Sequence, residues 1–270
     1  MRQDLRILVA GFGNMGRALV RGWLDAGAAP ADISIADSSA AACELAVEWG
    51  VAVHDVDEDQ KFDVVVIAVK PQHVDGALTQ FAGALRDGGV FVSVAAGRTL
   101  ASLQRCVAAD AALVRTMPNT PAAIARGTTV LCANAAVTAD QRSLCGELLA
   151  AVGEVFWVED EALLDAVTAV SGSGPAYVFL LIECLAAAGV RQGLSPELAQ
   201  ALASHTIAGS GEYAANSKED IARLREQVTS PGGTTQAALE VFMKNDALRS
   251  LVDAAVKAAA TRSRELSQNE

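Results

Sequence analysis

The sequence predicts an α/β protein in which a doubly wound parallel sheet is followed by an all-α domain. Two patterns carry this prediction. In residues 1–160, short apolar runs of strand length alternate with segments of helical spacing, as in a doubly wound sheet. In residues 161–270 no convincing strand occurs, and the helices are rich in Ala, Leu and Val.

The elements of the first domain follow from apolar runs and from glycine punctuation. After Asp63, residues 64–69 form a continuous apolar run, typical of a strand covered on both faces. Helical spacing covers residues 15–26 and 40–50, and Gly50 ends the second helix. The predicted strands are residues 5–10, 33–36, 51–53, 63–69, 90–94, 112–116, 128–133 and 155–158.

The second domain is divided by helix start signals. Residues 163–189 have helical spacing, interrupted at Ser171-Gly-Ser-Gly174. Ser195-Pro196-Glu197 combines a cap, a proline at the first helical position and an acid, which marks a helix start. Residues 217–220 give a second such signal, and a last long helix is expected from about 246 to 266. So much apolar helical surface favours burial against a second copy of the chain.

Composition narrows the classes of partner. The net charge of −11 argues against nucleic acid, which is bound through basic surfaces, and against docking on anionic membranes. The apolar run 176–190 is broken by Glu183 and shorter than a membrane span, and no signal peptide is visible. Five scattered cysteines without CxxC pairing indicate buried thiols in a reducing compartment, so we expect a cytoplasmic protein without a metal site.

A GxGxxG motif predicts a nucleotide-binding site. It consists of Gly11, Phe12, Gly13, Asn14, Met15 and Gly16, directly after a predicted strand and at the start of a helix. In this context it predicts a Rossmann dinucleotide-binding domain, with Gly11 in the tight turn, Gly13 beside the pyrophosphate and Gly16 allowing close helix packing.

Asp37 follows the second predicted strand, where an acid usually meets the adenosine ribose. Its carboxylate would repel a 2′-phosphate and favour NADH, yet Ser38 and Ser39 could donate to such a phosphate and no arginine is adjacent. Use of NADPH or NADH therefore stays open. So does the alternative that Asp37 only caps a turn.

Further candidate cofactor residues follow the next strands. Val69, Lys70 and Pro71 come after the fourth strand, and Lys70 has the reach for a ribose or a phosphate. Ala95-Ala96-Gly97 leaves space for a flat ring, and Asn119 offers an amide donor and acceptor between two prolines. Because ligands of such sheets bind at the carboxyl ends of the strands, these segments outline one cleft.

A second candidate site lies far along the chain from these segments, and we expect its turn to fold over the same cleft, the alternatives being a place elsewhere on the helical domain or at a neighbouring subunit's cleft. Residues 229–235, Thr-Ser-Pro-Gly-Gly-Thr-Thr, favour a tight turn followed by a helix start, and residues 236–242 return to helical spacing. The free backbone N–H groups of such a helix end bind anions, including carboxylates. The candidates are Ser230, Gly232, Gly233, Thr234 and Thr235, and plain helix capping is the alternative.

Over essentially its whole length the chain resembles pyrroline-5-carboxylate reductase. The resemblance rests on residues 11–16, 68–71 (Ala-Val-Lys-Pro), 92–97, 115–121 (Arg-Thr-Met-Pro-Asn-Thr-Pro), 171–177 (Ser-Gly-Ser-Gly-Pro-Ala-Tyr) and 228–235. It implies reduction of 1-pyrroline-5-carboxylate to L-proline with NADPH or NADH, the final step of proline synthesis. It also implies a helical dimerisation domain and homodimers that often assemble into decamers.

Carried over by position, the resemblance implies roles for individual residues. Asp55 and Gln227 stand where relatives have Asn, which leaves their own contacts open. The residues implied to line the cofactor are Ser38, Asp55, Val69, Lys70, Ala96 and Gln227, and those implied to line the substrate are Glu161, Thr234 and Thr235.

The residues also bear on the chemistry. A cyclic imine protonates readily, so its reduction needs no strong acid, and Thr235 is the predicted catalytic residue that orients or delivers the proton. A β-hydroxyacid dehydrogenase is the nearest rival, but that chemistry usually needs a lysine on the central helix, and no lysine occurs between Lys70 and Lys218. A nucleotide-sensing protein without turnover is a further alternative, although it would have no reason to retain the turn at 229–235.

Overall fold

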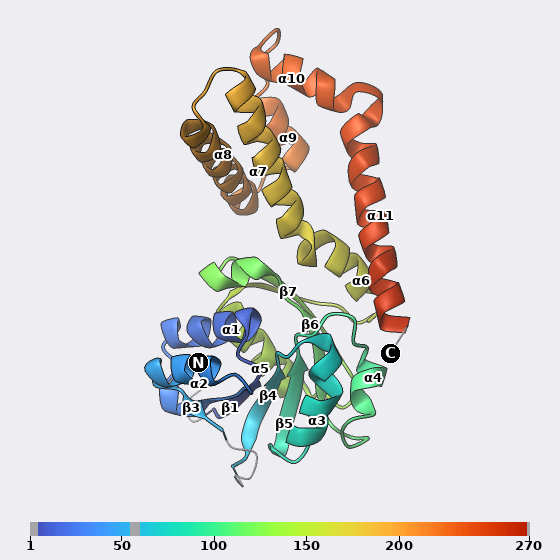
Figure 1. The fold of residues 1–270 in the computed structure, drawn as a ribbon. Helices are drawn as coiled ribbons and strands as arrows, with labels where there is room; N and C mark the ends of the chain where they lie inside the picture. Colours follow the sequence, from blue (N-terminus) through green and yellow to red (C-terminus); the bar gives the residue numbers. More distant parts are fainter. Residues whose placement is uncertain (1–4, 55–59, 269–270) are drawn as a thin grey trace. The chain divides into compact units, whose positions relative to one another are not determined.

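The computed structural model describes residues 5–54 and 60–268, which form two compact units (Figure 1). The first unit comprises the chain up to Gly172 together with the residues from Ala259 onward, and the second comprises Ser173–Ala258. The division by compactness differs from the predicted domains 1–160 and 161–270, because the end of the last helix returns to the first unit. The boundary at 160/161 remains a prediction of where the nucleotide-binding part ends and the substrate-binding and dimerisation part begins.

The first unit is built on a mixed sheet with the strand order β3-β2-β1-β4-β5-β6-β7-β8. Neighbouring strands are parallel except β6 and β7, which are antiparallel. The strands of the described residues are β1 (Ile7–Ala10), β2 (Ile33–Ala36), β3 (Ala52–Val53), β4 (Phe62–Ile67), β5 (Leu85–Ser93), β6 (Leu113–Met117), β7 (Gly127–Ala133) and β8 (Gly153–Trp157).

The strand order creates a switch point beside β1. The chain moves outward from β1 to β2 and β3, then crosses to the other side of β1 to form β4 and β5. Ligands of open α/β sheets bind at this point, beyond the carboxyl ends of the strands. The segments after β1, β2, β4 and β5 are the ones that the sequence indicates for the cofactor.

Alternate residues of the strands fill two hydrophobic cores, one on each face of the sheet. Ile7 and Val9 face α1 (Asn14–Asp25), α2 (Ala40–Glu48) and α5 (Ala139–Ala150). Leu8 and Ala10 face α3 (Val74–Phe81) and α4 (Leu100–Gln104), which Figure 1 shows on the opposite side of the sheet. Buried Trp23 joins α1 to α5 by donating its Nε1–H to the carbonyl of Leu148 at 2.8 Å.

Two features of the sheet differ from the sequence-based expectation. Strand β5 begins at Leu85 rather than at residue 90. The prediction misses this first half because residues 86–89 (Arg-Asp-Gly-Gly) are polar and glycine-rich and do not show the apolar run of a buried strand. The pairing of β4 with β5 is irregular in this stretch. The antiparallel direction of β7 was not foreseen either.

A π-helical segment, Thr168–Gly172, joins α6 (Leu163–Val167) to α7 (Gly174–Arg191). It overlaps the interruption predicted at residues 171–174 at its last two residues, and the chain leaves the first unit directly after it. The chain returns in α11 (Ala247–Gln268), where Ser263 donates its hydroxyl to Asp165 Oδ1 at 2.6 Å. π-Bulges occur frequently at functional sites.

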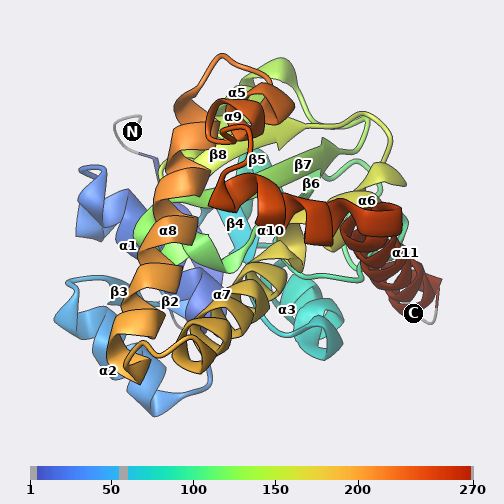
Figure 2. The same ribbon diagram turned by 90° about the horizontal axis from the view of Figure 1, so that it is seen from above.

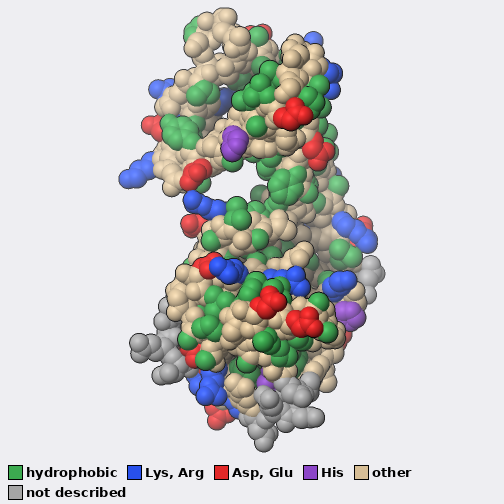
Figure 3. Space-filling view, turned by 60° about the vertical axis from the view of Figure 1, so that its left-hand side comes forward, with side chains coloured by type: hydrophobic (Ala, Val, Ile, Leu, Met, Phe, Trp, Pro, Cys, Tyr) green, Lys and Arg blue, Asp and Glu red, His purple; other side chains and the backbone are tan. Residues whose placement is uncertain are grey.

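The second unit is helical throughout and buries little of its apolar surface. Its hydrophobic centre consists of Ala186, Ala199 and Ala203 where α7 and α8 pack side by side (Figure 2). Phe179 and Leu180 are 57% and 59% exposed at the protomer surface. Hydrophobic side chains, in green, are among those visible on the surface in Figure 3. The remaining helices are α8 (Pro196–Asn216), α9 (Ile221–Gln227) and α10 (Thr234–Met243).

The helical stretch Leu163–Arg191 is longer than the run considered from the sequence. By length and composition it could cross a membrane, and very little of its most apolar window is buried in the protomer. Such a face needs a cover, which is either lipid or another protein surface.

The five cysteines are free, as expected, but they are not all buried. Cys132 and Cys145 are buried, Cys43 and Cys106 are partly buried, and Cys184 is exposed on α7. The expectation of a buried thiol is therefore wrong for Cys184 within the protomer, because α7 presents that residue on its uncovered face.

The buried thiol of Cys145 should resist alkylation. Burial raises the pKa of Cys145 from 9.0 to about 12, and the thiolate is the nucleophile. The folded protein keeps a proton that the unfolded chain loses, so this contribution to stability is complete below pH 9.0 and is lost as the pH rises through about 12. Mass spectrometry after iodoacetamide treatment at pH 9 should find Cys145 modified in urea but protected in the native protein. Equal labelling rates would contradict this environment.

Candidate functional site

The Gly11–Gly16 loop has the geometry that its predicted roles require. Gly11 adopts φ +99°, and a Cβ there would lie 2.7 Å from the Ala68 carbonyl carbon. A Cβ on Gly16 would lie 2.2 Å from the Gly11 carbonyl oxygen, so α1 packs too closely for any side chain. A Cβ on Gly13 would meet no described residue within 4 Å. The middle glycine therefore leaves its backbone open to a ligand.

The other residues of the loop divide between the core and the surface. The Phe12 side chain is fully buried and meets Trp49 edge-on, with ring centroids 5.4 Å apart. Only the backbone of Phe12 is therefore suited to ligand contact. Asn14 is exposed at the start of α1, and Met15 is half-buried.

Asp37 holds the loop from the end of β2. Its Oδ2 accepts the Phe12 N–H at 2.6 Å, and its Oδ1 accepts the Ser39 N–H at 2.8 Å. The turn-capping role that the sequence left open is thus present, and each carboxylate oxygen still has a lone pair for a ribose hydroxyl. Contact with a ribose remains a prediction.

A cleft of about 590 Å³ lies beside this turn at the carboxyl end of the sheet. Two histidines line it, and buried His54 packs edge-on against Phe62 with ring centroids 5.1 Å apart. Lys70 and Pro71 are exposed after β4 and do not line the cleft, while Asp55 lies outside the described residues. The lining residues are Ala10, Gly11, Ala36, Asp37, Ser38, His54, Val69, Gln72, His73, Gly76, Ala77, Gln80 and Phe81.

Asn119 is committed to the protein framework. Its Oδ1 accepts the Thr128 N–H at 2.8 Å, and its Nδ2 donates to the Ser171 carbonyl at 3.0 Å. The side chain thus joins the β6–β7 connection to the π-helical segment. The predicted contact of Asn119 with the cofactor is untested, and one N–H of the amide is left for it.

A buried arginine that the sequence did not single out follows the Ala95–Gly97 loop, in which Ala96 is exposed. Arg98 pairs with Asp75 of α3 and donates its Nε–H to Ser102 Oγ at 3.2 Å. Burial alone would raise the pKa of Asp75, but hydrogen bonds from Arg98 and Cys106 outweigh it and lower that pKa. This network fixes the loop after β5 to the helices on one face of the sheet.

Glu161, a predicted substrate residue, is tied to two other segments of the first unit. Its Oε1 accepts the Arg115 Nη1–H and the Leu100 N–H, both at 2.7 Å. Arg115 is itself missed by the sequence reasoning as a site residue, although a charge inside the apolar run 112–117 was a usable signal. Burial first, and then the Glu161 carboxylate, raise the pKa of neighbouring Cys132.

The predicted turn and helix start at 229–235 are present in the second unit. Gly232 adopts φ +70°, and its N–H donates to Gln236 Oε1 at 2.7 Å. The Gly233 N–H donates to the Ser230 carbonyl at 3.0 Å, and α10 begins at Thr234. Because the N-cap Gly233 provides no side-chain cap, the first N–H groups of α10 are available to an anion.

The hydroxyls of this turn differ in exposure. Ser230 and Thr234 are exposed, Thr235 is half-buried, and Gln227 is exposed at the end of α9. Thr235 is the second residue of α10 rather than its N-cap, and no described residue hydrogen-bonds its side chain, so its role stays a prediction.

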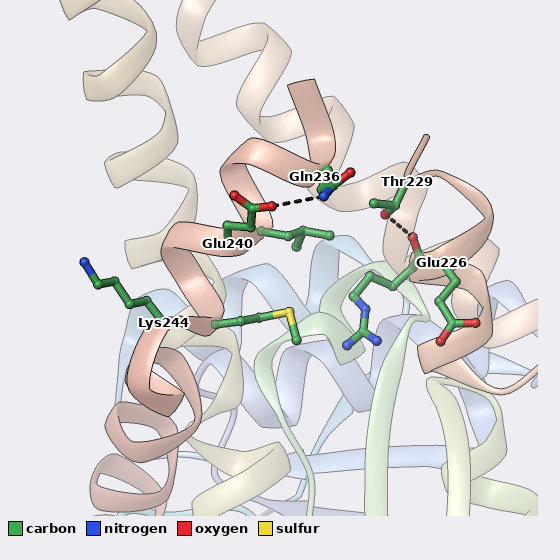
Figure 4. Close-up of a pocket in the computed structure, with 8 residues that line it drawn as sticks. Glu226, Thr229, Gln236, Glu240 and Lys244 are labelled. Atoms are coloured by element: carbon green, nitrogen blue, oxygen red, sulfur yellow. Dashed lines mark hydrogen bonds between the residues drawn. The ribbon is translucent and has the colours of Figure 1, made fainter. Parts of the chain in front are cut away.

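A cavity of about 460 Å³ lies between α9 and α10, on the side of the turn where Thr229 and Gln236 point (Figure 4). Gln236 donates to Glu240 Oε1 at 3.0 Å, and Thr229 donates to the Arg225 carbonyl at 2.6 Å. Neither Thr234 nor Thr235 lines this cavity. The lining residues are Arg225, Glu226, Thr229, Gln236, Leu239, Glu240, Met243 and Lys244.

Two glycine substitutions should separate folding from cofactor binding. Gly16→Ala places a methyl group against the Gly11 carbonyl and should lower the free energy of unfolding by about 1–3 kcal/mol or more. Gly13→Ala, the matched control, should lower it by at most about 1 kcal/mol, because alanine is a poorer N-cap of α1 than glycine. The same Gly13→Ala should weaken NADPH binding by about tenfold, equivalent to roughly 1.4 kcal/mol. Urea unfolding and a fluorescence titration measure the two effects, and the reverse pattern would contradict the assigned roles.

Comparison with known proteins adds to this geometry. The family model described as pyrroline-5-carboxylate reductase dimerisation matches residues 161–266, and the model described as NADP oxidoreductase coenzyme F420-dependent matches residues 6–97. The pyrroline-5-carboxylate reductase of Pseudomonas aeruginosa is 42% identical over 266 residues, covering 97% of each chain. That of Arabidopsis thaliana is 38% identical, covering 99% of this chain and 97% of its own.

Solved structures agree with these relatives. The Coxiella burnetii pyrroline-5-carboxylate reductase superposes with a TM-score of 0.93 at 35% identity, covering 98% of this chain and 99% of its own. The Plasmodium falciparum pyrroline carboxylate reductase, solved with NADP bound, gives 0.85 at 28% identity, covering 99% and 100%. The chain has a nucleotide loop at the switch point and an uncapped helix start in the second unit, and these relatives match it along nearly its whole length. The protein therefore belongs to the pyrroline-5-carboxylate reductase family.

Proposed function

We propose that this chain reduces 1-pyrroline-5-carboxylate to L-proline, with NADPH or NADH as hydride donor, as the final step of proline synthesis. The observation that supports this most is the uncapped start of α10 at Thr234, which offers backbone N–H groups to a carboxylate in a chain whose other end carries a nucleotide loop. A nucleotide sensor without turnover has no use for an anion-binding helix start such as that of α10.

The cofactor lies on the carboxyl edge of β1, β2, β4 and β5. The N–H groups at the start of α1 hold the pyrophosphate, and Asp37 and Ser38 meet the adenosine ribose or its phosphate. The residues we assign to the cofactor are Gly11, Phe12, Gly13, Asn14, Met15, Gly16, Asp37, Ser38, Asp55, Val69, Lys70, Pro71, Ala96, Asn119 and Gln227.

The substrate is held mainly by its carboxylate. Backbone N–H groups of the turn and of the first turn of α10 bind this anion, favoured by the helix dipole. The Thr235 hydroxyl hydrogen-bonds the ring nitrogen. The residues we assign to the substrate are Glu161, Ser230, Gly232, Gly233, Thr234 and Thr235.

The reaction itself makes modest demands on the protein. The bound reduced nicotinamide would supply a hydride to the imine carbon, and the C=N π electrons would move to the nitrogen. The nitrogen takes a proton and becomes the amine of proline, and the cofactor is left oxidised. An imine is basic enough to be protonated before or during transfer, so positioning and charge placement carry most of the acceleration.

The active form is a homo-oligomer. The exposed apolar side chains of α7 and α8, including Phe179 and Leu198, support a dimer through the second unit. Dimers assemble further, up to a decamer, and the enzyme works in the cytoplasm, where free thiols persist. Sedimentation at micromolar concentration should give at least a dimer, and a monomer would contradict this part of the proposal.

Mixing the protein with 1-pyrroline-5-carboxylate and NADPH tests the function. Loss of the reduced cofactor's absorbance should match the proline formed, and parallel runs with NADH give the cofactor preference. Proline formation with neither cofactor across neutral pH would contradict the proposed reaction.

Thr235→Ala tests the predicted catalytic residue. Loss of one hydrogen bond to the reacting nitrogen should lower kcat by about 10²–10³, or roughly 2.7–4 kcal/mol of barrier. Thr235→Ser keeps the hydroxyl and should retain most of the activity. Near-full turnover of Thr235→Ala at saturating substrate would show that the hydroxyl has no such role.

A further inference from the structure

Arg115 is a charged residue in the middle of the buried strand β6, between Ser93 of β5 and Cys132 of β7. Only 3% of its side chain is exposed. Its Nη1 donates to Glu161 Oε1 at 2.7 Å, and its Nε and Nη2 have no acceptor among the described residues. Glu161 is therefore the single described counter-charge of this buried guanidinium, which would be costly to leave unpaired.

The Glu161 carboxylate is held through one oxygen only. Oε1 accepts from Arg115 and from the Leu100 N–H at 2.7 Å. Leu100 is the first residue of α4 and lies three residues after Gly97, so this bond ties Glu161 to the loop that carries Ala96. Oε2 accepts no hydrogen bond from the described residues, and 27% of the Glu161 side chain remains exposed.

The ion pair of Arg142 and Glu159 serves as a comparison, because both of its carboxylate oxygens accept hydrogen bonds. Arg142 donates Nη1–H to Glu159 Oε2 at 3.3 Å and Nη2–H to Glu159 Oε1 at 2.6 Å, so both oxygens are used. This fork geometry is the usual one for arginine and a carboxylate. The Arg115–Glu161 pair departs from this geometry, because buried Arg115 donates to Oε1 alone and no described residue donates to Oε2.

We propose that Arg115 is a positioning residue of the reduction, which fixes Glu161 so that its Oε2 stays available to the substrate at the carboxyl edge of β5. The inference rests on the substrate role proposed above for Glu161. The planar guanidinium suits this task better than an ammonium group, because its donors have fixed directions. The buried small cluster of Met117, Val130, Cys132 and Leu164 holds β6, β7 and α6 together around the pair.

A purely structural role makes a different prediction. If the pair only fastens β6 to the segment before α6, activity should follow stability. Replacing both partners by Arg115→Met with Glu161→Gln removes the buried charge and should recover much of the stability that either single change loses. The double variant therefore separates the two roles.

The experiment measures melting temperature, kcat, and KM for 1-pyrroline-5-carboxylate and for NADPH, each variant being assayed well below its melting temperature. We expect Arg115→Met to lower kcat/KM for the imine by about 10- to 100-fold, as misplacement of a positioned group does. KM for NADPH should stay within about twofold of wild type, and the double variant should regain stability without regaining kcat/KM. If Arg115→Met does not fold, Arg115→Lys takes its place in the experiment. This variant retains the buried charge, so it should give the same readout with a smaller loss of kcat/KM for the imine.

Arg142→Met is the matched control, because it breaks the neighbouring pair at an exposed carboxylate and should leave kcat/KM unchanged. Recovery of kcat/KM together with stability in the double variant would overturn the inference. If Glu161→Gln lowers kcat/KM but Arg115→Met and Arg115→Lys do not, the role of Arg115 fails and that of Glu161 stands. If Glu161→Gln itself leaves kcat/KM for the imine unchanged, the substrate role of Glu161 fails and the inference with it.

Discussion

The close approach of Gly11 to the backbone of Ala68, directly after β4, and of Gly16 to the Gly11 carbonyl is the constraint on which the nucleotide end of this reductase depends. Two positions of the loop exclude any side chain because backbone atoms lie within 2.7 Å of where a Cβ would stand. The carboxylate of Asp37 then fixes the loop through the Phe12 N–H. As a result, the start of α1 faces the switch point of the sheet with its N–H groups directed at whatever binds there.

The same physical device recurs at the start of α10, where Gly232 and Gly233 form the turn and no side chain caps the helix. We assign a pyrophosphate to the first helix start and a small carboxylate to the second. Reduction of the imine needs little from acidic or basic side chains, because a protonated imine is already an electrophile. This explains how a reductase can manage without a lysine between Lys70 and Lys218.

Much of this could be predicted from the sequence, because it depends on local patterns. Glycine spacing, strand-length apolar runs and the turn at 229–235 each report on their own segment. The antiparallel direction of β7 was missed, although the short connection of residues 118–126 leaves no room for a crossover helix. The first half of β5 was missed because its residues 86–89 are polar or glycine, and its pairing with β4 is a tertiary effect.

The ion pair of Arg115 and Glu161 could not be predicted in the same way. The two residues are 46 positions apart, and no spacing rule joins a mid-strand arginine to a glutamate before a helix. Only the fold brings them together and shows that one carboxylate oxygen is bound while the other is not. The exposed apolar faces of α7 and α8 are a related case, since helical spacing shows that a face is apolar but not what covers it.

In the proposed reaction, hydride passes directly from the nicotinamide to the imine carbon of the substrate. The most direct measurement uses NADPH carrying deuterium at the transferred C4 position, followed by mass spectrometry of the proline formed in ordinary water. Direct transfer should give proline with one deuterium, bonded to the ring carbon next to nitrogen that was the imine carbon. Unlabelled proline, or label lost to the solvent, would contradict direct transfer.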